Sequence, residues 1–195
     1  ESRATAARVV ERVAREVFIP LTVGGGVRSV ADARRLLDSG CDKVAVNSAA
    51  VRRPELLAEL AEVLGRQCVV LAVDALTTPE GSRVTVDAGR TVTTVPVCCW
   101  LELGQDLGAG EVLLTSIDRD GCHTGYDLGL LAEAAPVCRV PLVASGGLST
   151  PADAAAAFQA GADAVLAASR FHAGELTVSE VKAFLAAQGF EVRPC

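Results

Sequence analysis

The chain carries the same sequence block twice, and this duplication constrains its fold more than any other feature. Residues 18–48 align without a gap to residues 139–169, and Pro20 lies 121 residues before its match, Pro141. The blocks read IPLTVGGGVRSVADARRLLDSGCDKVAVNS and VPLVASGGLSTPADAAAAFQAGADAVLAAS. Each block reads as a strand, a Gly-Gly turn, a helix, a Gly-x-Asp turn and a second strand. A repeat this long indicates duplication of a whole supersecondary unit, as in a duplicated (β/α) barrel.

Strand and helix patterns alternate along the whole chain. Short apolar runs predict strands over 21–23, 43–47, 68–74, 111–116, 142–145 and 164–168. Periodic or capped segments predict helices over 5–17, from 29 onward, and over 54–64, 97–107, 127–135, 151–160 and 178–188. The polar stretch 77–94 predicts a small hairpin. Strands that alternate with helices indicate a parallel sheet with right-handed crossovers, with ligands bound at the rim where the strands end.

Length limits how complete such a barrel can be. A (β/α)₈ barrel takes about 250 residues, whereas this chain has 195 and contains no methionine. We therefore expect residues 1–195 to form a single α/β domain of the (β/α)₈ TIM-barrel type. It would be an N-terminally incomplete barrel of about six βα units that lacks the first two strands. An open barrel leaves two edge strands, near 20–23 and 164–168, and unpaired edges favour self-association.

Composition excludes several classes of function. The net charge of −6 and the lack of a Lys/Arg run argue against nucleic acid as a partner. No apolar run is long enough to cross a membrane. Seven scattered cysteines without a CxxC pair indicate buried free thiols in a reducing compartment, so we expect a cytoplasmic protein. The two histidines have no metal-ligand spacing, and we expect neither a metal nor a cofactor.

Glycine turns and small polar residues follow the predicted strands of both repeats. These motifs are GGG (24–26) with NS (47–48), and SGG (145–147) with AAS (167–169). Glycine allows backbone N–H groups to converge on an oxyanion, so each pair of motifs predicts a phosphate-binding cup. Turn geometry alone explains most single Gly-Gly turns, but two matched cups suggest a substrate with a phosphate at each end.

Aspartates are the candidates for acid–base chemistry. Asp74 ends an apolar predicted strand, where a partly dry carboxyl can have a shifted pKa; the alternative is a cap or turn aspartate. Asp118 and Asp120 flank Arg119, so they either pair with it or, in the case of Asp120, face a substrate.

Specific motifs resemble one family. TVGGGVRS, DKVAVNSAAV, QCVVLAVDA, GAGEVLLTSIDRDG and ASGG followed by GADAVLAAS-FH-GE are similar to the cyclase subunit of imidazole glycerol phosphate synthase, a lyase of histidine biosynthesis. The resemblance implies a reaction of ammonia with a bisphosphorylated formimino ribonucleotide (PRFAR). The products are imidazole glycerol phosphate and AICAR, and the ammonia comes from a glutaminase subunit or domain.

The resemblance also implies roles for individual residues. Asp74 is one of two catalytic aspartates, while Asp120 and Ser145 line the substrate. One phosphate is bound by Gly26, Asn47 and Ser48, and the other by Gly121, Gly147, Ala168 and Ser169. At the opposite rim, Asp42 and Lys43 face the glutaminase, and Lys43 and Glu111 belong to a charged gate over the ammonia channel; an ordinary ion pair is the alternative for Lys43 and Glu111.

Departures from the family pattern leave other functions open. The family's first strand, which carries the second catalytic aspartate, has no counterpart here. The family usually has a basic residue two positions after the aspartate that matches Asp74, where this chain has Leu76. It usually has a serine two residues before the asparagine that matches Asn47, where this chain has Ala45. The truncated chain is therefore either an active cyclase, an inactive piece of one, or a non-catalytic phosphate-binding or assembly fragment. The sister barrel, the ProFAR isomerase, shares the duplication and is a further alternative.

Overall fold

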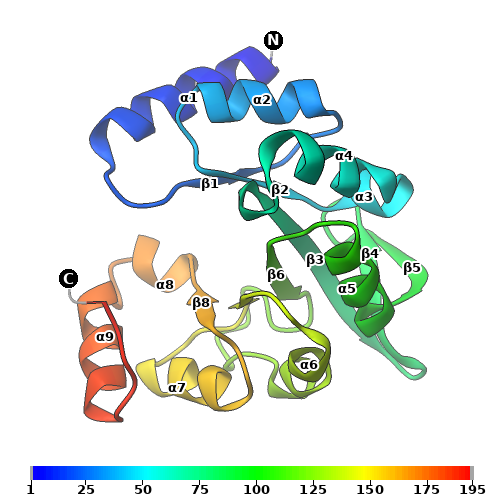
Figure 1. Cartoon of the computed structure of the whole chain (residues 1–195). Coiled ribbons are helices and arrows are strands. Elements are labelled where there is room, and N and C mark those ends of the chain that lie inside the picture. The colour runs from blue at the N-terminus through cyan, green and yellow to red at the C-terminus, as the bar shows by residue number, and fades with distance from the viewer. Residues whose placement is uncertain (1, 194–195) are drawn as a thin grey trace.

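The computed structural model describes residues 2–193, which build one mixed sheet covered by helices (Figure 1). Six parallel strands pair in the order β1-β2-β3-β6-β7-β8, and β4 and β5 add an antiparallel extension to β3. The strands are β1 Thr22–Gly24, β2 Lys43–Val46, β3 Val69–Thr78, β4 Gly81–Val86, β5 Thr91–Pro96, β6 Glu111–Ser116, β7 Leu142–Ser145 and β8 Ala164–Leu166. This is the predicted (β/α) barrel architecture with six parallel strands, and the predicted hairpin is confirmed as β4 and β5.

Every long helix that the sequence predicted is present. The helices are α1 Ser2–Glu16, α2 Val30–Asp38, α3 Ser48–Arg52, α4 Glu55–Leu64, α5 Val97–Asp106, α6 Leu128–Ala134, α7 Pro151–Gln159, α8 Ser169–His172 and α9 Val178–Ala187. Short 3₁₀ turns span Arg66–Cys68 and Ala135–Val137. The sequence missed α3, α8 and both 3₁₀ turns, because one turn of helix is too short to show a periodic apolar face.

Helix caps form where the sequence placed them. Ser29 Oγ accepts a hydrogen bond from the backbone N–H of Asp32 and begins α2. Thr177 and Glu180 make a reciprocal capping box at the start of α9. Gly65 ends α4 with a φ of 86°, a value that favours glycine.

The duplication is preserved down to strand register and single hydrogen bonds. Thr22 of β1 pairs with Lys43 of β2, and their matches Val143 and Ala164 pair in the same register in β7 and β8. In the first copy, the Asp42 carboxylate accepts a 2.7 Å bond from the backbone N–H of Leu21. In the second copy, the matching Asp163 carboxylate accepts a 2.8 Å bond from the backbone N–H of Leu142. The repeat is therefore a structural unit as well as a sequence pattern.

The sheet is curved but open. Among the described residues, β1 pairs only with β2 and β8 only with β7, so these two are the edges that the sequence predicted. In Figure 1 they lie at opposite ends of the sheet. Thr22 of β1 and Leu166 of β8 nevertheless line the same cavity, together with Leu113 of β6. The curvature therefore brings both edges toward a shared interior, as in a barrel.

The core lies between the sheet and the helices of its outer face. Val69, Val70, Leu71 and Val73 of β3 are fully buried, as expected for a parallel strand covered on both sides. Buried side chains from α4, α5, α6, α7 and α9 join the same cluster. The core is thus continuous across both copies of the repeat.

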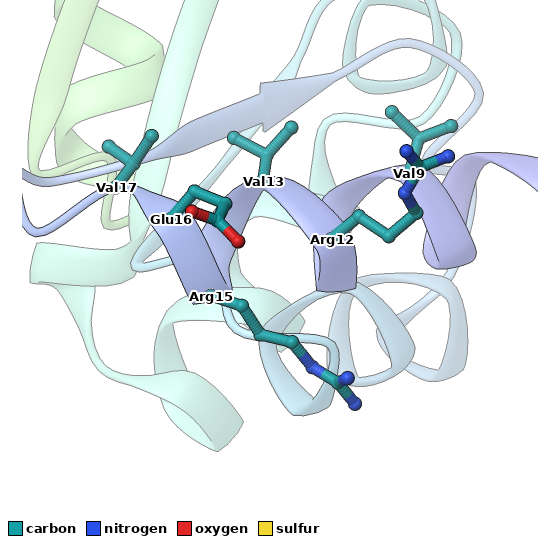
Figure 2. A pocket seen from close by; sticks show the side chains of 6 residues that line it. All are labelled: Val9, Arg12, Val13, Arg15, Glu16 and Val17. Carbon is teal, nitrogen blue, oxygen red and sulfur yellow. The ribbon is translucent and has the colours of Figure 1, made fainter.

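Helix α1 and the segment after it are less covered. Val9 and Val13 are 53% and 37% exposed, and Phe18 is 91% exposed. Figure 2 shows Val9, Val13 and Val17 pointing to one side of α1, in a shallow hollow that Arg12, Arg15 and Glu16 also line. Val9, Val13 and Phe18 are therefore exposed apolar side chains on a surface that charged residues share.

The cysteines are less buried than the composition predicts. The described cysteines are all free thiols, but only Cys41 is buried, and Cys99 and Cys122 are exposed. The expectation that the thiols are buried is therefore wrong for those two, and Cys195 lies outside the described residues. Within residues 2–193, no helix is both long and apolar enough to span a bilayer. No group of three His, Cys, Asp or Glu side chains in that range could hold a metal ion.

Candidate active site

The candidate residues gather at the rim where the parallel strands end. Gly26 follows β1, Asn47 and Ser48 follow β2, and Gly121 follows β6. Ser145 ends β7, and Ala168 precedes α8. Because the strands are parallel, these segments meet on one edge of the sheet. The structure thus brings together the residues that the two repeats supply.

Asp74 lies inside β3 and not at its end. The strand continues to Thr78 because Asp74 pairs with Thr115 of β6 on one side and with Thr85 of β4 on the other. The expectation that the strand ends at Asp74 is therefore wrong. The hairpin extends the strand, and Asp74 is neither a helix cap nor a turn residue.

The surroundings of Asp74 suit a group that exchanges protons. Burial raises the pKa of its carboxyl; a hydrogen bond from the Asn47 side chain acts against this, and the negative charge of Asp120 adds to it. The net effect is a raised pKa. Asp74 lies within β3, Asn47 follows β2 and Asp120 lies in the loop after β6, so the fold brings groups from three elements close enough to interact.

The first cup opens into the larger cavity, with a volume of about 880 Å³. Residues lining it include Gly24, Gly25, Gly26, Arg28, Asn47, Ser48, Arg52, Arg53, Asp87 and Ala88. Gly25 and Gly26 have φ values of 91° and 78°, and a Cβ at either position would meet no atom within 4 Å. The Oδ1 atom of Asn47 is buried and finds no hydrogen-bond partner among the described residues. This cup is therefore open, and it carries polar groups at its glycine turn and at Asn47 that no side chain fills.

The second cup is smaller and more enclosed, with a cavity of about 110 Å³. Its lining includes Asp120, Gly121, His123, Ser145, Gly146, Gly147, Ala168 and Ser169. The loop after β6 packs across it: the Gly147 carbonyl accepts a 2.9 Å bond from the N–H of Gly125. Leu166 lines both cavities, so the two cups are neighbours on the rim and not isolated hollows.

The aspartates beside Arg119 do not pair with it. Asp118 accepts a 2.8 Å bond from the backbone N–H of Thr77, which ties the loop after β6 to the hairpin. Arg119 donates to the hydroxyl of Thr124. Asp120 is exposed and lines the second cup. The sequence left two interpretations of Asp120, an ion pair with Arg119 or a place facing a substrate, and its position in the cavity lining agrees with the second.

The remaining predicted residues lie at the opposite end of the strands. Lys43 begins β2 and Glu111 begins β6, and the Lys43 ammonium forms an ion pair with the Glu111 carboxylate. Both side chains are partly buried. The neighbouring Asp42 carboxylate holds the Leu21 N–H, so it has a structural role within this chain.

Sequence reasoning missed two residues of the first cup. Arg52 ends α3 and Asp87 lies in the turn between β4 and β5, and their side chains form an ion pair beside Ser48. The contact joins segments 35 residues apart, and no motif in the sequence marks either partner.

Comparison with known proteins identifies the family. A profile described as "Histidine biosynthesis protein" matches residues 1–177. The imidazole glycerol phosphate synthase subunit HisF of Mycobacteroides abscessus is 54% identical over 98% of this chain and 77% of its own length. The HisF subunits of Leifsonia xyli and Mycobacterium tuberculosis are each 53% identical, over 78% and 74% of their own lengths. The chain belongs to the HisF family.

Membership of the HisF family confirms the resemblance drawn from the motifs. It agrees with the (β/α) barrel architecture. The match spans both copies of the repeat and the segment between them, so neither copy is a borrowed piece of another fold.

Proposed function

We propose that this HisF-family chain carries the cyclase site of imidazole glycerol phosphate synthase. The reaction joins ammonia with PRFAR and yields imidazole glycerol phosphate and AICAR. One observation carries the proposal: Asp74, a partly buried carboxyl with a raised pKa, lies where Asn47 of the first cup and Asp120 of the second both reach it. We propose that a substrate occupying both cups passes next to this carboxyl.

Each cup suits one phosphate of the substrate. In the first, Gly26, Asn47 and Ser48 offer backbone N–H groups and a hydroxyl around an open cavity. In the second, Gly121, Gly147, Ala168 and Ser169 surround a space of about 110 Å³. Asp120 and Ser145 line the same second cavity and are the proposed substrate contacts there. Two fixed phosphates hold the reacting centre in place, and such positioning lowers the barrier of a bimolecular step.

Asp74 is the proposed proton carrier. Ionised, it accepts a proton from ammonia or from the substrate, and protonated, it returns one to the leaving group. A pKa raised from its ordinary value toward neutrality improves both steps, because acid–base catalysis is most efficient when the pKa is near the working pH. The Asn47 side chain holds the carboxylate in place through its hydrogen bond.

Ammonia is proposed to enter from the opposite rim. The Lys43–Glu111 ion pair lies there, at the starts of β2 and β6, and is the proposed gate. A glutaminase subunit or domain would dock on the surface around Asp42 and Lys43. The bond from Leu21 to Asp42 fixes that surface, so Asp42 contributes to docking through shape as well as charge.

The test is ammonia-dependent consumption of PRFAR by the purified chain, with PRFAR binding measured in parallel. Asp74→Asn keeps the size of the side chain and removes its proton chemistry, so turnover should be lost while binding is kept. Turnover that survives in Asp74→Asn would refute the assignment of this carboxyl. Binding without turnover in the unaltered chain would favour the alternative of a non-catalytic phosphate-binding fragment.

The ProFAR isomerase activity is the other alternative. The same preparation should leave ProFAR unchanged, and measurable isomerisation would support the isomerase alternative.

The described cysteines are free thiols, which supports the reducing cytoplasm as the site of action.

The open edges support a proposal about assembly. Strands β1 and β8 lack a second partner within the described residues, and the nearby Phe18 is 91% exposed. We propose that a second copy of this single-domain chain covers these edges. Light scattering should therefore find a dimer or larger species, and a stable monomer at all concentrations would contradict it.

A further inference from the structure

We propose that Arg52 is a phosphate-binding residue of the first cup, held ready by Asp87. The inference rests on the proposed function, in which that cup binds one phosphate of the substrate. No motif of the sequence analysis includes either residue, and neither has a counterpart in the second cup: the position that matches Arg52 is Ala173.

The turn between β4 and β5 forms one wall of the cup. Among residues 2–193, three non-glycine residues have a positive φ, and two of them, Asp87 (56°) and Ala88 (58°), form this turn. Both line the first cavity. Left-handed backbone at alanine is strained, because its Cβ approaches the following carbonyl oxygen too closely. Strain of this kind is concentrated at functional sites, so its position beside the cup calls for an explanation.

The strained turn directs two groups of Asp87 toward α3. Its backbone N–H donates a 2.9 Å hydrogen bond to Ser48 Oγ. Its carboxylate accepts bonds of 2.7 and 2.6 Å from Nη2 of Arg52. This bond uses only an acceptor position of Ser48 Oγ, which leaves its O–H to donate into the cup.

The guanidinium of Arg52 keeps donors for a ligand. The contacts to Asp87 involve Nη2 alone, so the Nη1 and Nε groups remain to meet an anion in the cavity. The side chain is 58% exposed and lines the cavity with Gly24, Gly25 and Gly26. Arginine presents its donors in a fork that matches phosphate oxygens, and such charge-assisted bonds are stronger than neutral ones.

Charge distinguishes the two cups. Arg28, Arg52 and Arg53 all line the first cavity, against the single carboxylate of Asp87. Arg53 is engaged elsewhere, since both of its terminal nitrogens bond the Glu59 carboxylate. Among the described residues, the second cavity has no Lys or Arg in its lining. A directed cation is therefore a property of the first cup, and Arg52 is the one linked to Ser48 through a shared partner.

The test compares PRFAR and inorganic phosphate binding to the purified chain and to three variants by calorimetry. Arg52→Gln should weaken PRFAR binding about 10- to 100-fold, the loss of one charge-assisted hydrogen bond or two. Arg53→Gln removes the same charge from the same rim and should weaken binding much less than Arg52→Gln, because both terminal nitrogens of Arg53 already bond the Glu59 carboxylate. Equal losses in these two variants would overturn the proposal.

Asp87→Asn separates direct binding from a purely structural role. It keeps the backbone N–H for Ser48, an amide oxygen that can accept from Nη2 of Arg52, and the charge of Arg52 itself, so affinity should fall much less than in Arg52→Gln. A loss as large as that of Arg52→Gln would mean that the ion pair only supports the turn, which would overturn the proposal. If the unaltered chain binds neither PRFAR nor phosphate, the proposed function fails and the role of Arg52 fails with it. If it binds and Arg52→Gln binds equally well, only the role of Arg52 fails.

Discussion

The two copies of the repeat share a backbone but not an environment. Gly26 follows β1 and its match Gly147 follows β7, and both glycines have a positive φ. A Cβ at Gly26 meets open space, whereas one at Gly147 would collide with the carbonyl oxygen of Gly125. The loop after β6 covers the second cup, and the β4–β5 turn borders the first. Duplication therefore reproduced the frame of each cup, while later segments gave each cup its own wall.

The largest contrast should come from alanine at the matched glycines. Gly147→Ala is expected to lower the free energy of unfolding by about 3 kcal/mol, since it adds overpacking to backbone strain. Gly26→Ala should cost about 1 kcal/mol, from backbone strain alone. Urea unfolding of both variants measures the difference. Equal losses would mean that the loop after β6 yields to the added methyl group.

A smaller difference in stability should come from Asp42 and Asp163, which accept hydrogen bonds from backbone N–H groups at the starts of strands. Asp163→Ala leaves the N–H of the buried Leu142 without its partner, at an expected cost of about 2 kcal/mol. Asp42→Ala frees the N–H of the partly exposed Leu21, which water can reach, so about 1 kcal/mol should be lost. The same unfolding experiment compares them, and a larger loss in Asp42→Ala would contradict the burial argument.

Asn47 and its match Ala168 sharpen the comparison in terms of pH. Asn47→Ala gives the first cup the residue of the second and removes the hydrogen bond that lowers the pKa of Asp74. That pKa should rise further. If ionised Asp74 is the active form, the acidic limb of the pH–rate profile should move to higher pH.

Ser169→Ala is the control for that experiment. It alters the second cup without touching Asp74, so affinity should fall while the acidic limb stays in place. An unchanged profile in Asn47→Ala would mean that Asp74 does not govern the limb.

The smallest contrast concerns the strained residues in the two walls. Ala88 (φ 58°) lines the first cup and His123 (φ 53°) the second. Ala88→Gly relieves strain and should stabilise the fold by about 0.5 kcal/mol, after the entropy lost by glycine on folding. His123→Gly should gain less, because the ring Nδ1 lies 3.4 Å from the Leu148 carbonyl oxygen and that contact is lost. Thermal unfolding resolves the order, and an inverted order would show that the ring contact contributes nothing.

Local patterns predicted most of the fold. Apolar runs identified all six parallel strands, and capping residues such as Ser29 and Thr177 marked helix starts, because each signal is contained within a few residues. The glycine turns and the small polar residues after each strand located both cups for the same reason. Parallel strands then bring their ends together whatever the intervening sequence.

What the sequence did not predict depends on contacts between distant segments. Strand β3 passes Asp74 because β4 pairs with its second half, and no residue near Asp74 signals this. The Arg52–Asp87 pair needs both the short helix α3 and a strained turn. The sequence suggests that Asp118 pairs with its neighbour Arg119, but its partner is the backbone N–H of Thr77, 41 residues away. Side-chain partners across elements are set by packing, which single-sequence patterns do not encode.

Asp42 accepts a hydrogen bond from the N–H of Leu21, and Asp163 accepts the matching bond from the N–H of Leu142. These two bonds have a consequence for how such a barrel can arise. Each bond joins the start of one strand to the start of the next, so the register of a strand pair is fixed by residues within the repeat itself. A segment with its own alignment can be copied to a new place and still assemble correctly. The duplicated unit could therefore form its strand pair at either position in the chain, and the two copies differ mainly in the segments that surround them.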